Sequence, residues 1–400
     1  MKILVVCQHF YPENFRVNDL CFELVKKGHN VTVLTGLPNY PKGYVLPEYK
    51  WFKNRQQEIN GVKIIRCSLI GRRTSTLMMG INYLWFMFFG CLKALFMKKD
   101  FDIVYAYQLS PITMVWPGIV VSKIKKIPLV LHCLDQWPIS VTTGPIPKGS
   151  LLYKILFKIS VWTYKKANRI IISSKSFKQY FITELKLKED EKDFTYYPSY
   201  AENEYENVGC EDNGVFDIVF AGNIGPAQSV ETIIETANIL KDNKEIVFHI
   251  VGDGLSRANC EQLKDSYGLS NVIFHGYHDV SKMPEYYRLA DCFIITMVDN
   301  EVVNSTLPAK LQSYMLAGKP IIGAINGEVK EVVKDAKCGL CCDSGDYEDL
   351  AKIILKVYND KGSLTQWGSN ALHYYEEHFE KEKCIQNLEN ILNEEILKRR

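Results

Sequence analysis

Along nearly the whole chain, short apolar runs alternate with segments whose apolar residues recur at helical spacing. In the first half, apolar runs of strand length occupy residues 3–7, 31–34, 62–66, 103–105, 129–131 and 170–173. Segments of helical period lie between them, for example at 18–27, 113–124 and 151–166. This alternation is typical of βαβ units, so it predicts a doubly wound parallel sheet.

A second set of alternating segments begins near residue 215. Its strand-type runs occupy 216–221, 246–251, 272–274 and 292–296, with helical segments at 230–240, 260–266 and 284–289. We therefore predict an α/β chain of two Rossmann-like domains, residues 1–198 and 215–377, which face each other across a cleft at their strand ends. The polar stretch 199–214 is the expected linker. The charged stretch 367–398 is expected to be helical, with residues 378–400 crossing back to the first domain.

Charge and cysteine usage limit the classes of function. Lys and Arg total 48 against 46 acidic residues, so nothing in the charge balance points to a nucleic-acid partner. The 12 cysteines are scattered, apart from Cys338, Cys341 and Cys342, and no second pair or histidine cluster completes a zinc set. We expect no metal, a strand-and-turn role for that cluster, and a reducing, cytoplasmic location.

Residues 77–97 are apolar over a length that could span a bilayer, between basic pairs at 72–73 and 98–99. However, Asn82 interrupts the segment, and a membrane span here would split the predicted sheet. We expect a helix buried in the first domain, with one side at a membrane surface. The basic amphipathic pattern of 151–169 supports such peripheral association, although a solvated helix face explains that pattern equally well.

The stretch 306–320 predicts a short helix that opens just after a buried strand. Pro308 is tolerated in a first helical turn, and Gly318 followed by Pro320 marks the end. Lys310 lies in the first turn, where backbone amides are free and the helix dipole favours an anion. The start of this helix at Lys310 is therefore a candidate phosphate site. Taken alone, however, the stretch favours an ordinary αβ connection with a surface lysine, because most helix N-termini bind nothing.

Loops after the strands of the second half could complete a nucleotide-diphosphate pocket. Their glycines allow close backbone approach, but none of the loops matches a P-loop or a GxGxxG motif. Because parallel strands end at one edge of a sheet, these loops and the 306–320 helix are expected to meet. The residues predicted to bind the nucleotide-linked ligand are Gly222, Asn223, Ile224, Gly225, Gln228, Gly252, Asp253, Gly254, Arg257, Tyr277, Thr306, Leu307, Pro308, Ala309 and Ser313.

In the first half, polar residues follow two of the predicted strands. His132 and Asp135 lie at the end of a buried strand and could serve as an acid, a base or a hydroxyl ligand. Asp135 is the stronger candidate, because alternation along a strand need not point both side chains the same way. A satisfied core histidine is the alternative for His132. Glu13 and Arg16 follow the first strand.

Together these motifs resemble the family 4 glycosyltransferases of the GT-B fold, over essentially the whole chain. The resemblance rests on segments 10–13, 28–41, 134–138, 222–225, 251–254 and 308–320. It implies a retaining enzyme that takes a sugar from a nucleotide donor, with helix termini and basic side chains in place of a metal. It implies catalytic roles for Asp135, Lys310 and His132, and places Glu13 and Arg16 on the acceptor side.

More narrowly, the chain is similar to the bacterial L-fucosamine transferases, which build cell-surface polysaccharide. This similarity implies a UDP-linked donor carrying N-acetyl-L-fucosamine or another acetamido sugar. It also implies a lipid-linked saccharide as acceptor, in O-antigen or capsule synthesis, at the inner face of the cytoplasmic membrane.

The second half departs from the family pattern in two ways. Ser305 and Ser313 stand where many members carry two glutamates that contact the donor. Asn223 and Gln228 fall near the places of a common Arg and Lys. These departures keep open a non-catalytic scaffold of the same fold.

The first half also departs from the pattern. Leu134 replaces the histidine before Asp135, and Ile139 replaces a glutamate that the subgroup usually has. The identity of the sugar or acceptor is therefore open. A sugar-nucleotide epimerase on a similar tandem fold is a further alternative.

Overall fold

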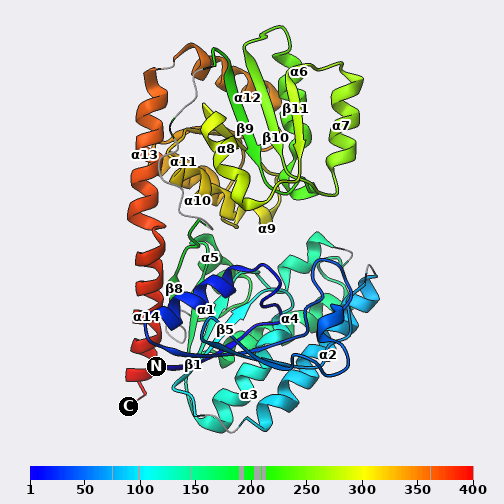
Figure 1. The fold of residues 1–400 in the computed structure, drawn as a ribbon, viewed down its shortest axis with the longest axis vertical. Helices are drawn as coiled ribbons and strands as arrows, with labels where there is room; N and C mark the ends of the chain where they lie inside the picture. Colours follow the sequence, from blue (N-terminus) through cyan, green and yellow to red (C-terminus); the bar gives the residue numbers. More distant parts are fainter. Residues whose placement is uncertain are drawn as a thin grey trace. The chain divides into compact units, whose positions relative to one another are not determined.

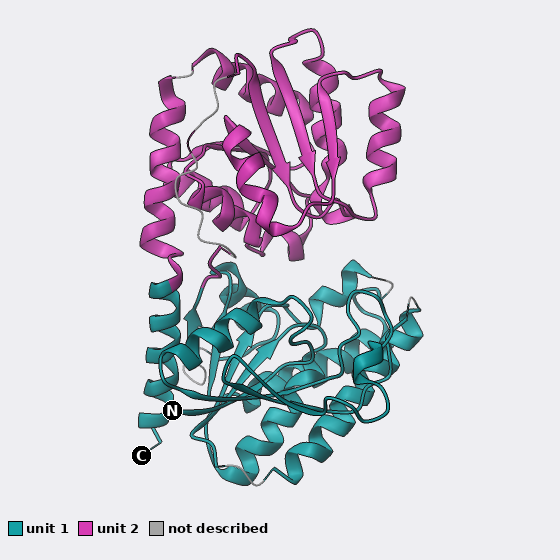
Figure 2. Ribbon diagram, viewed as in Figure 1, with its two compact units in different colours: residues 1–197, 382–400 teal, residues 198–381 magenta. Residues whose placement is uncertain are grey.

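The computed structural model describes residues 1–73, 75–97, 100–144, 146–188, 193–201, 209, 213–360 and 362–399. The chain forms two compact α/β units (Figure 1), which are coloured separately in Figure 2. Unit 1 comprises Met1–Tyr197 and Glu382–Arg400, and unit 2 comprises Pro198–Lys381. Most of the stretch 199–214, the expected linker, lies outside the described residues.

Unit 1 is built on an eight-stranded sheet with the order β3-β4-β2-β1-β5-β6-β7-β8. The strands are β1 (Lys2–Val6), β2 (Asn30–Thr35), β3 (Gln56–Ile59), β4 (Val62–Arg66), β5 (Ile103–Gln108), β6 (Leu129–Cys133), β7 (Arg169–Ile172) and β8 (Asp193–Tyr196). All neighbouring pairs are parallel except β3 and β4. Each strand predicted in the first half is present, because its apolar run is buried within a parallel sheet.

The apolar pattern does not predict the two edge strands, β3 and β8. Strand β3 is largely polar, as suits an edge that is covered on one side only. It forms an antiparallel hairpin with β4 in which Ile59 pairs with Val62. Asn60 and Gly61 form the turn with φ of 49° and 77°. This Asn-Gly pair is a strong hairpin signal, so the turn, rather than the apolar pattern, reveals the strand.

Five helices of unit 1 lie between its strands: α1 (Arg16–Lys26), α2 (Thr76–Leu95), α3 (Trp116–Lys125), α4 (Leu151–Lys166) and α5 (Ser176–Thr183). Helix α2 packs on α3. The contact is close, because a Cβ at Gly90 would lie 2.7 Å from Cγ of Pro117.

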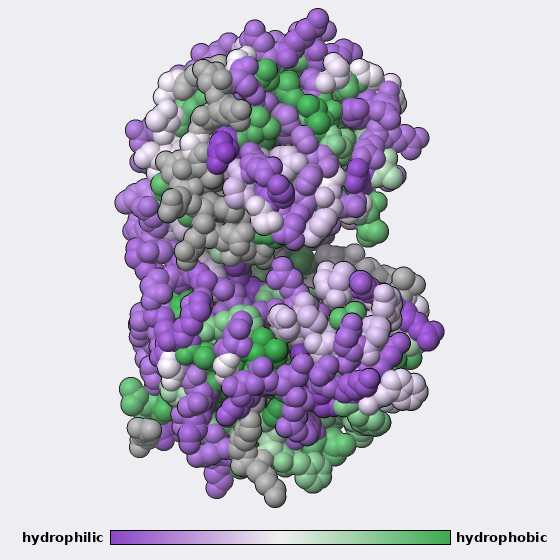
Figure 3. Space-filling view, viewed as in Figure 1, coloured by the Kyte–Doolittle hydropathy of each residue, from purple (hydrophilic) through white to green (hydrophobic). Residues whose placement is uncertain are grey.

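Residues 77–97 were expected to form a helix buried in the first domain with one side left outward, and the structure has a helix there, although less of it is buried than expected. A narrow stripe of α2 is buried, at Asn82, Phe86, Gly90 and Ala94, which are four residues apart and so share one face. The other face is exposed and apolar, at Leu77, Leu84, Phe88, Leu92 and Leu95. By length and apolar composition alone α2 could cross a membrane. Figure 3 shows apolar residues at the lower edge of unit 1, where α2 and α3 lie in Figure 1.

Unit 2 is built on a six-stranded parallel sheet with the order β11-β10-β9-β12-β13-β14. Its strands are β9 (Phe216–Ala221), β10 (Ile246–Val251), β11 (Val272–Gly276), β12 (Cys292–Thr296), β13 (Ile321–Ala324) and β14 (Gly339–Cys342). Its helices are α6 (Val230–Ile239), α7 (Arg257–Ser266), α8 (Met283–Leu289), α9 (Glu301–Asn304), α10 (Ala309–Leu316), α11 (Glu328–Ala336), α12 (Tyr347–Asn359) and α13 (Gly362–His378). The order places β9 at the centre, where its carboxyl end meets several loops.

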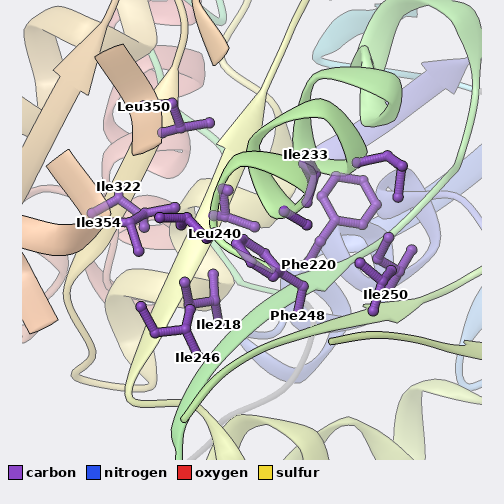
Figure 4. Close-up of a cluster of buried hydrophobic side chains, with 14 of the residues drawn as sticks. Ile218, Phe220, Ile233, Leu240, Ile246, Phe248, Ile250, Ile322, Leu350 and Ile354 are labelled. Carbon is purple, nitrogen blue, oxygen red and sulfur yellow. The ribbon is translucent and has the colours of Figure 1, made fainter. Parts of the chain in front are cut away.

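The sheet of unit 2 buries apolar side chains on both faces. Ile218 and Phe220 of β9 join a cluster with residues of α6 and α12 (Figure 4). Val219 and Ala221 of the same strand join a second cluster, which includes Leu311, Tyr314 and Met315 of α10. Alternation along β9 therefore fixes α10 on one face of the sheet, next to the end of the central strand.

The C-terminal stretch is helical, as predicted, but it consists of two helices. Helix α13 ends at His378, and α14 (Lys381–Leu397) begins three residues later. Between them the ring of Phe379 is buried in the core of unit 2. The end of α13 is thus anchored in unit 2, and the chain then passes to unit 1.

Buried and exposed charges join α14 to the rest of unit 1. Arg169 of β7 is 4% exposed. Its guanidinium donates to Glu395 at 3.0 Å and to Glu394 at 2.9 Å, and pairs with Asp193 at 2.7 Å. Near the middle of the helix, Glu389 lies 2.6 Å from Nε2 of His29.

We predict that Glu395→Gln destabilises unit 1 by about 3–5 kcal/mol, because it removes one partner of a buried ion pair. Glu394→Gln is the matched control, since its side chain is 58% exposed and exposed pairs contribute about 1 kcal/mol or less. Five of the six tryptophans, Trp51, Trp85, Trp116, Trp137 and Trp162, belong to unit 1. Urea unfolding followed by tryptophan fluorescence therefore reports mainly on that unit. Equal unfolding midpoints for the two variants would contradict the buried-pair interpretation.

Candidate functional site

Three loops meet at the carboxyl edge of the sheet in unit 2. Gly222, after β9, donates its N–H to Val251 O at 2.9 Å, and Gly252, after β10, donates to Gly276 O at 2.8 Å. The backbones are too close for side chains, because a Cβ at Gly252 would lie 1.8 Å from Gly222 O. Gly252 also has φ 143°, in the region that favours glycine. The predicted glycine loops therefore form one connected surface.

Lys310 reaches this surface from the first turn of α10. Its Nζ lies 3.8 Å from the centroid of the Phe220 ring. A Cβ placed on Gly222 would lie 3.2 Å from the same Nζ, so the absence of a side chain at Gly222 leaves room for the amine. Pro308 precedes the helix with extended backbone and caps it, rather than lying in its first turn as predicted.

The Lys310 ammonium is buried, and Nζ makes no hydrogen bond to any residue that the structure describes. Burial lowers the pKa of Lys310 to about 7. An ammonium carries three N–H donors, and burying it without a partner is unfavourable. An anion beside the Gly222 loop would supply the missing partner, so the geometry fits a phosphate site.

Tyr314 fixes α10 against β9, a role that the sequence pattern did not indicate. Its hydroxyl accepts from Ala221 N at 2.7 Å and donates to Ala221 O at 3.0 Å. Its ring stacks on Phe293 with centroids 4.0 Å apart. Tyr314 lies one turn after Lys310, so the two side chains dock the same face of α10 on the end of β9. The spacing from Lys310 was the available signal, but it also fits an ordinary apolar face.

The other predicted residues with polar side chains around this pocket fall into two groups. Near the glycine loops, Asn223 Nδ2 donates to Gln228 Oε1 at 3.0 Å. Arg257 pairs with Glu261 at 2.9 Å and lies 3.8 Å from Asp253.

The second group bonds locally or projects outward. The hydroxyls of Thr306 and Ser313 donate to Val303 O at 2.8 Å and to Ala309 O at 3.4 Å. These bonds stay within their own turns. Tyr277, in the loop after β11, is 72% exposed.

In unit 1, Asp135 lies in the loop after β6 and is held by a short chain of hydrogen bonds. Trp137 Nε1 donates to Ser110 Oγ at 2.9 Å, and that hydroxyl donates to Asp135 Oδ2 at 2.7 Å. Burial raises the pKa of the Asp135 carboxyl, and the bond from Ser110 opposes that rise. A partly buried carboxylate with one orienting donor can accept a proton or a hydroxyl hydrogen bond.

His132 does not share this position, although it lies only three residues earlier. Its Nδ1 bonds the Tyr105 hydroxyl at 2.6 Å, and its ring also contacts Tyr107 and Tyr197. The side chain is 3% exposed, and burial lowers its pKa to about 3. This placement favours a core histidine over a catalytic one, because the imidazole stays neutral and away from solvent.

Both carboxylate oxygens of Glu13 make hydrogen bonds within the protein. Its Oε1 accepts from the backbone amides of Asn39 and Tyr40, both at 2.6 Å, and its Oε2 lies 2.9 Å from His9 Nδ1. With both oxygens occupied, Glu13 organises the loop after β2 instead of contacting an acceptor. Arg16 opens α1, after the carboxyl end of β1. Burial raises the pKa of Tyr107, while the charge of Arg16 lowers it and that of Asp135 raises it, so both charges act on the same tyrosine.

Comparisons with known proteins cover both units. Residues 15–192 match the family model described as Glycosyltransferase Family 4, and residues 202–374 match the model described as Glycosyl transferases group 1. The colanic acid biosynthesis glycosyl transferase WcaI of Escherichia coli K12 is 24% identical over 342 residues, covering 80% of this chain and 82% of WcaI.

Solved structures of glycosyltransferases share the fold. Sucrose-phosphate synthase from Thermosynechococcus elongatus superposes with a TM-score of 0.76 at 14% identity, covering 98% of each chain. Anabaena HepE, solved in complex with UDP, has a TM-score of 0.70 at 16% identity and covers 98% of this chain and 100% of its own. The predicted fold and enzyme class are confirmed. The chain is a glycosyltransferase of the GT-B fold, with a family 4 domain in its first half and a group 1 domain in its second.

Proposed function

We propose that this glycosyltransferase moves a sugar from a UDP-linked donor to a lipid-linked saccharide in bacterial surface-polysaccharide synthesis, such as that of O-antigen or capsule. The transferred sugar is N-acetyl-L-fucosamine or another acetamido sugar, and it retains its anomeric configuration. The name of WcaI supports the pathway class, and the UDP complex of HepE supports the donor class.

One observation carries the donor half of this proposal, namely the unpaired buried ammonium of Lys310 beside the Gly222 loop. A diphosphate placed there gains a cation at Lys310 and free backbone amides at the start of α10. With that cation present, the diphosphate needs no metal. Asn223 and Gln228 stand where the family's usual basic residues fall, so Lys310 supplies a positive charge that those positions lack.

The transfer reaction explains why a cation beside the diphosphate favours catalysis. The bond between the anomeric carbon and the diphosphate oxygen breaks, and its electron pair moves onto the diphosphate. The oxygen of the acceptor hydroxyl forms the new bond on the same face of the sugar, and its proton passes to a base. Negative charge on the diphosphate therefore grows in the transition state, and Lys310 stabilises that state more than the bound donor.

We predict that UDP binding at about pH 9 is accompanied by uptake of about one proton. In the free protein, burial lowers the pKa of Lys310 to about 7, so the amine is mostly neutral at that pH. A neighbouring diphosphate favours the ammonium form and raises the pKa again. Isothermal titration calorimetry in buffers of different ionisation enthalpy measures this uptake.

Lys310→Met should abolish the uptake and weaken UDP binding. Lys330→Met is the matched control, because Lys330 is a lysine of the same unit that lies on α11 and already pairs with Asp343 at 2.6 Å. A wild-type protein that takes up no proton, or an uptake that survives in Lys310→Met, would remove Lys310 from the donor site.

In the first unit, we assign Asp135 to the acceptor hydroxyl, as its base or as the carboxylate that orients it. Asp135→Asn keeps the shape and should lower kcat by about 100-fold or more. Ser110→Ala removes the donor that stabilises the carboxylate, so the pKa of Asp135 should rise and the acid limb of kcat/KM should move to higher pH. Steady-state assays over a panel of UDP-sugars test both variants. Turnover of Asp135→Asn within about threefold of the wild type would contradict the role.

We also propose a cytoplasmic protein that binds peripherally to the inner face of the cytoplasmic membrane. The exposed apolar stripe of α2 supports this proposal. So does α4, where Leu151 and Ile155 are exposed beside Lys154 and Lys158. Apolar side chains rimmed by lysines match an anionic lipid surface.

We predict that carbonate or high salt releases most of the protein from isolated membranes, since peripheral contacts depend on charge and shallow insertion. Phe88→Glu should lower the bound fraction by placing a charge in the stripe. Ile239→Glu is the control, because Ile239 is a comparably exposed apolar residue on α6 of unit 2. Retention after carbonate washing would instead indicate that α2 spans the bilayer.

A further inference from the structure

Arg72 lies in the segment between β4 and α2, and its backbone is anchored on both sides. The next residue, Arg73, donates its N–H to Gly43 O at 2.7 Å, and Gly43 N donates to Asn39 O at 2.7 Å. The approach is tight, because a Cβ at Gly71 would lie 2.7 Å from Gly43 O. The backbone that carries Arg72 is thus held against the loop after β2.

The Arg72 side chain lies over an aromatic ring that is also fixed. Its Cζ is 4.5 Å from the centroid of the Tyr40 ring. Glu13 holds the Tyr40 amide at 2.6 Å, and Phe15 packs against the ring with centroids 5.3 Å apart. A guanidinium stacked in this way keeps its planar edge of N–H donors available.

Within the part of the chain that the structure describes, no carboxylate forms an ion pair with Arg72, whose guanidinium lies over the Tyr40 ring. As a residue, Arg72 is partly buried. Its five donors suit two-point recognition of a phosphate. A fixed cation without an anionic partner is therefore a candidate binding group for an anionic ligand.

The position of Arg72 links it to Asp135. Burial raises the pKa of Tyr83 of α2, Arg72 lowers it, and Asp135 raises it. The topology places both charges at one edge, because β4 and β6 run parallel within the sheet of unit 1 and the segments that carry Arg72 and Asp135 follow their carboxyl ends. A ligand at this edge can therefore present a hydroxyl to Asp135 and a neighbouring anionic group to Arg72.

The outward stripe of α2 begins five residues after Arg72, at Leu77, which is 74% exposed, and continues through Leu84 and Phe88. In a lipid-linked saccharide, phosphate lies between the lipid and the sugar and so sits at the membrane surface. The order along unit 1 is the same, with an apolar stripe, then a cation, then a carboxylate. Because the lipid, phosphate and sugar hydroxyl of a lipid-linked acceptor follow the same order as this stripe, cation and carboxylate, that acceptor is the ligand we assign to this surface.

We propose that Arg72, held over Tyr40, binds the phosphate of the lipid-linked acceptor and so positions its sugar hydroxyl at Asp135. This inference rests on the acceptor class of the proposed function, and it adds the residue that recognises the phosphate. The lipid then lies along the outer stripe of α2, and the Glu13–His9 pair keeps the Tyr40 platform in place.

The test is binding of the full-length protein to phosphatidylcholine vesicles that contain a long-chain isoprenoid diphosphate. Reference vesicles carry phosphatidylglycerol at equal total charge. The wild type should bind the isoprenoid diphosphate vesicles more tightly, and Arg72→Gln should lose about 10-fold of that preference. Arg72→Lys should recover part of this preference, because lysine keeps the positive charge but lacks the planar pair of N–H donors that can bind two phosphate oxygens.

Arg73→Gln is the matched control, since it removes the neighbouring exposed charge and should leave the preference unchanged. Equal preference in Arg72→Gln and the wild type, or no preference in the wild type, would overturn the proposal. Thermal unfolding of each variant confirms that it is folded. Titration of the wild type with UDP separates the two proposals. If the wild type does not bind UDP, the donor site is contradicted. If it binds UDP but shows no preference for the isoprenoid diphosphate vesicles, only the role proposed for Arg72 is contradicted.

Discussion

The candidate donor site depends on one unfavourable arrangement, the burial of the Lys310 amine without a hydrogen-bond partner among the described residues. The fold creates it from two directions. Tyr314 bonds both backbone groups of Ala221 and so holds α10 on the end of β9. Gly222 lacks a side chain and so leaves Nζ beside the loop. Because burial favours the neutral amine, the free protein is disfavoured in a way that a bound diphosphate relieves.

Unit 1 has a similar arrangement, in which a fixed backbone holds charged side chains that keep free hydrogen-bonding capacity. Glu13 uses its whole carboxylate to hold the loop of Asn39 and Tyr40, and that loop presents the ring beneath Arg72. Ser110 donates to Asp135 and is itself held by Trp137. In each unit, buried groups with satisfied hydrogen bonds position a few polar groups that keep free bonding capacity, as pre-organised sites require.

Much of the fold follows from the sequence, because apolar runs of strand length separated by helix-period segments have few other solutions. The local sequence pattern does not predict features that depend on contacts between residues far apart in the chain. The strand β3 is polar and is revealed by its Asn60–Gly61 turn. The alternation along β6 assigns His132 to a face, but only the fold shows that Tyr105 and Tyr197 enclose it. Similarly, Glu13 follows a strand as an acceptor ligand would, yet its partners are backbone amides 26 and 27 residues away. For Lys310 the sequence predicts the helix turn, and the structure adds its burial against Phe220.

The most direct measurement of the donor site is a crystal structure of the chain with UDP. We expect the diphosphate against the Gly222 loop, with an oxygen within hydrogen-bond distance of Lys310 Nζ and the start of α10 close by. Ordered UDP whose phosphates lie away from Lys310, with Nζ still packed over the Phe220 ring and unpaired, would contradict the central claim that this buried amine completes a diphosphate site.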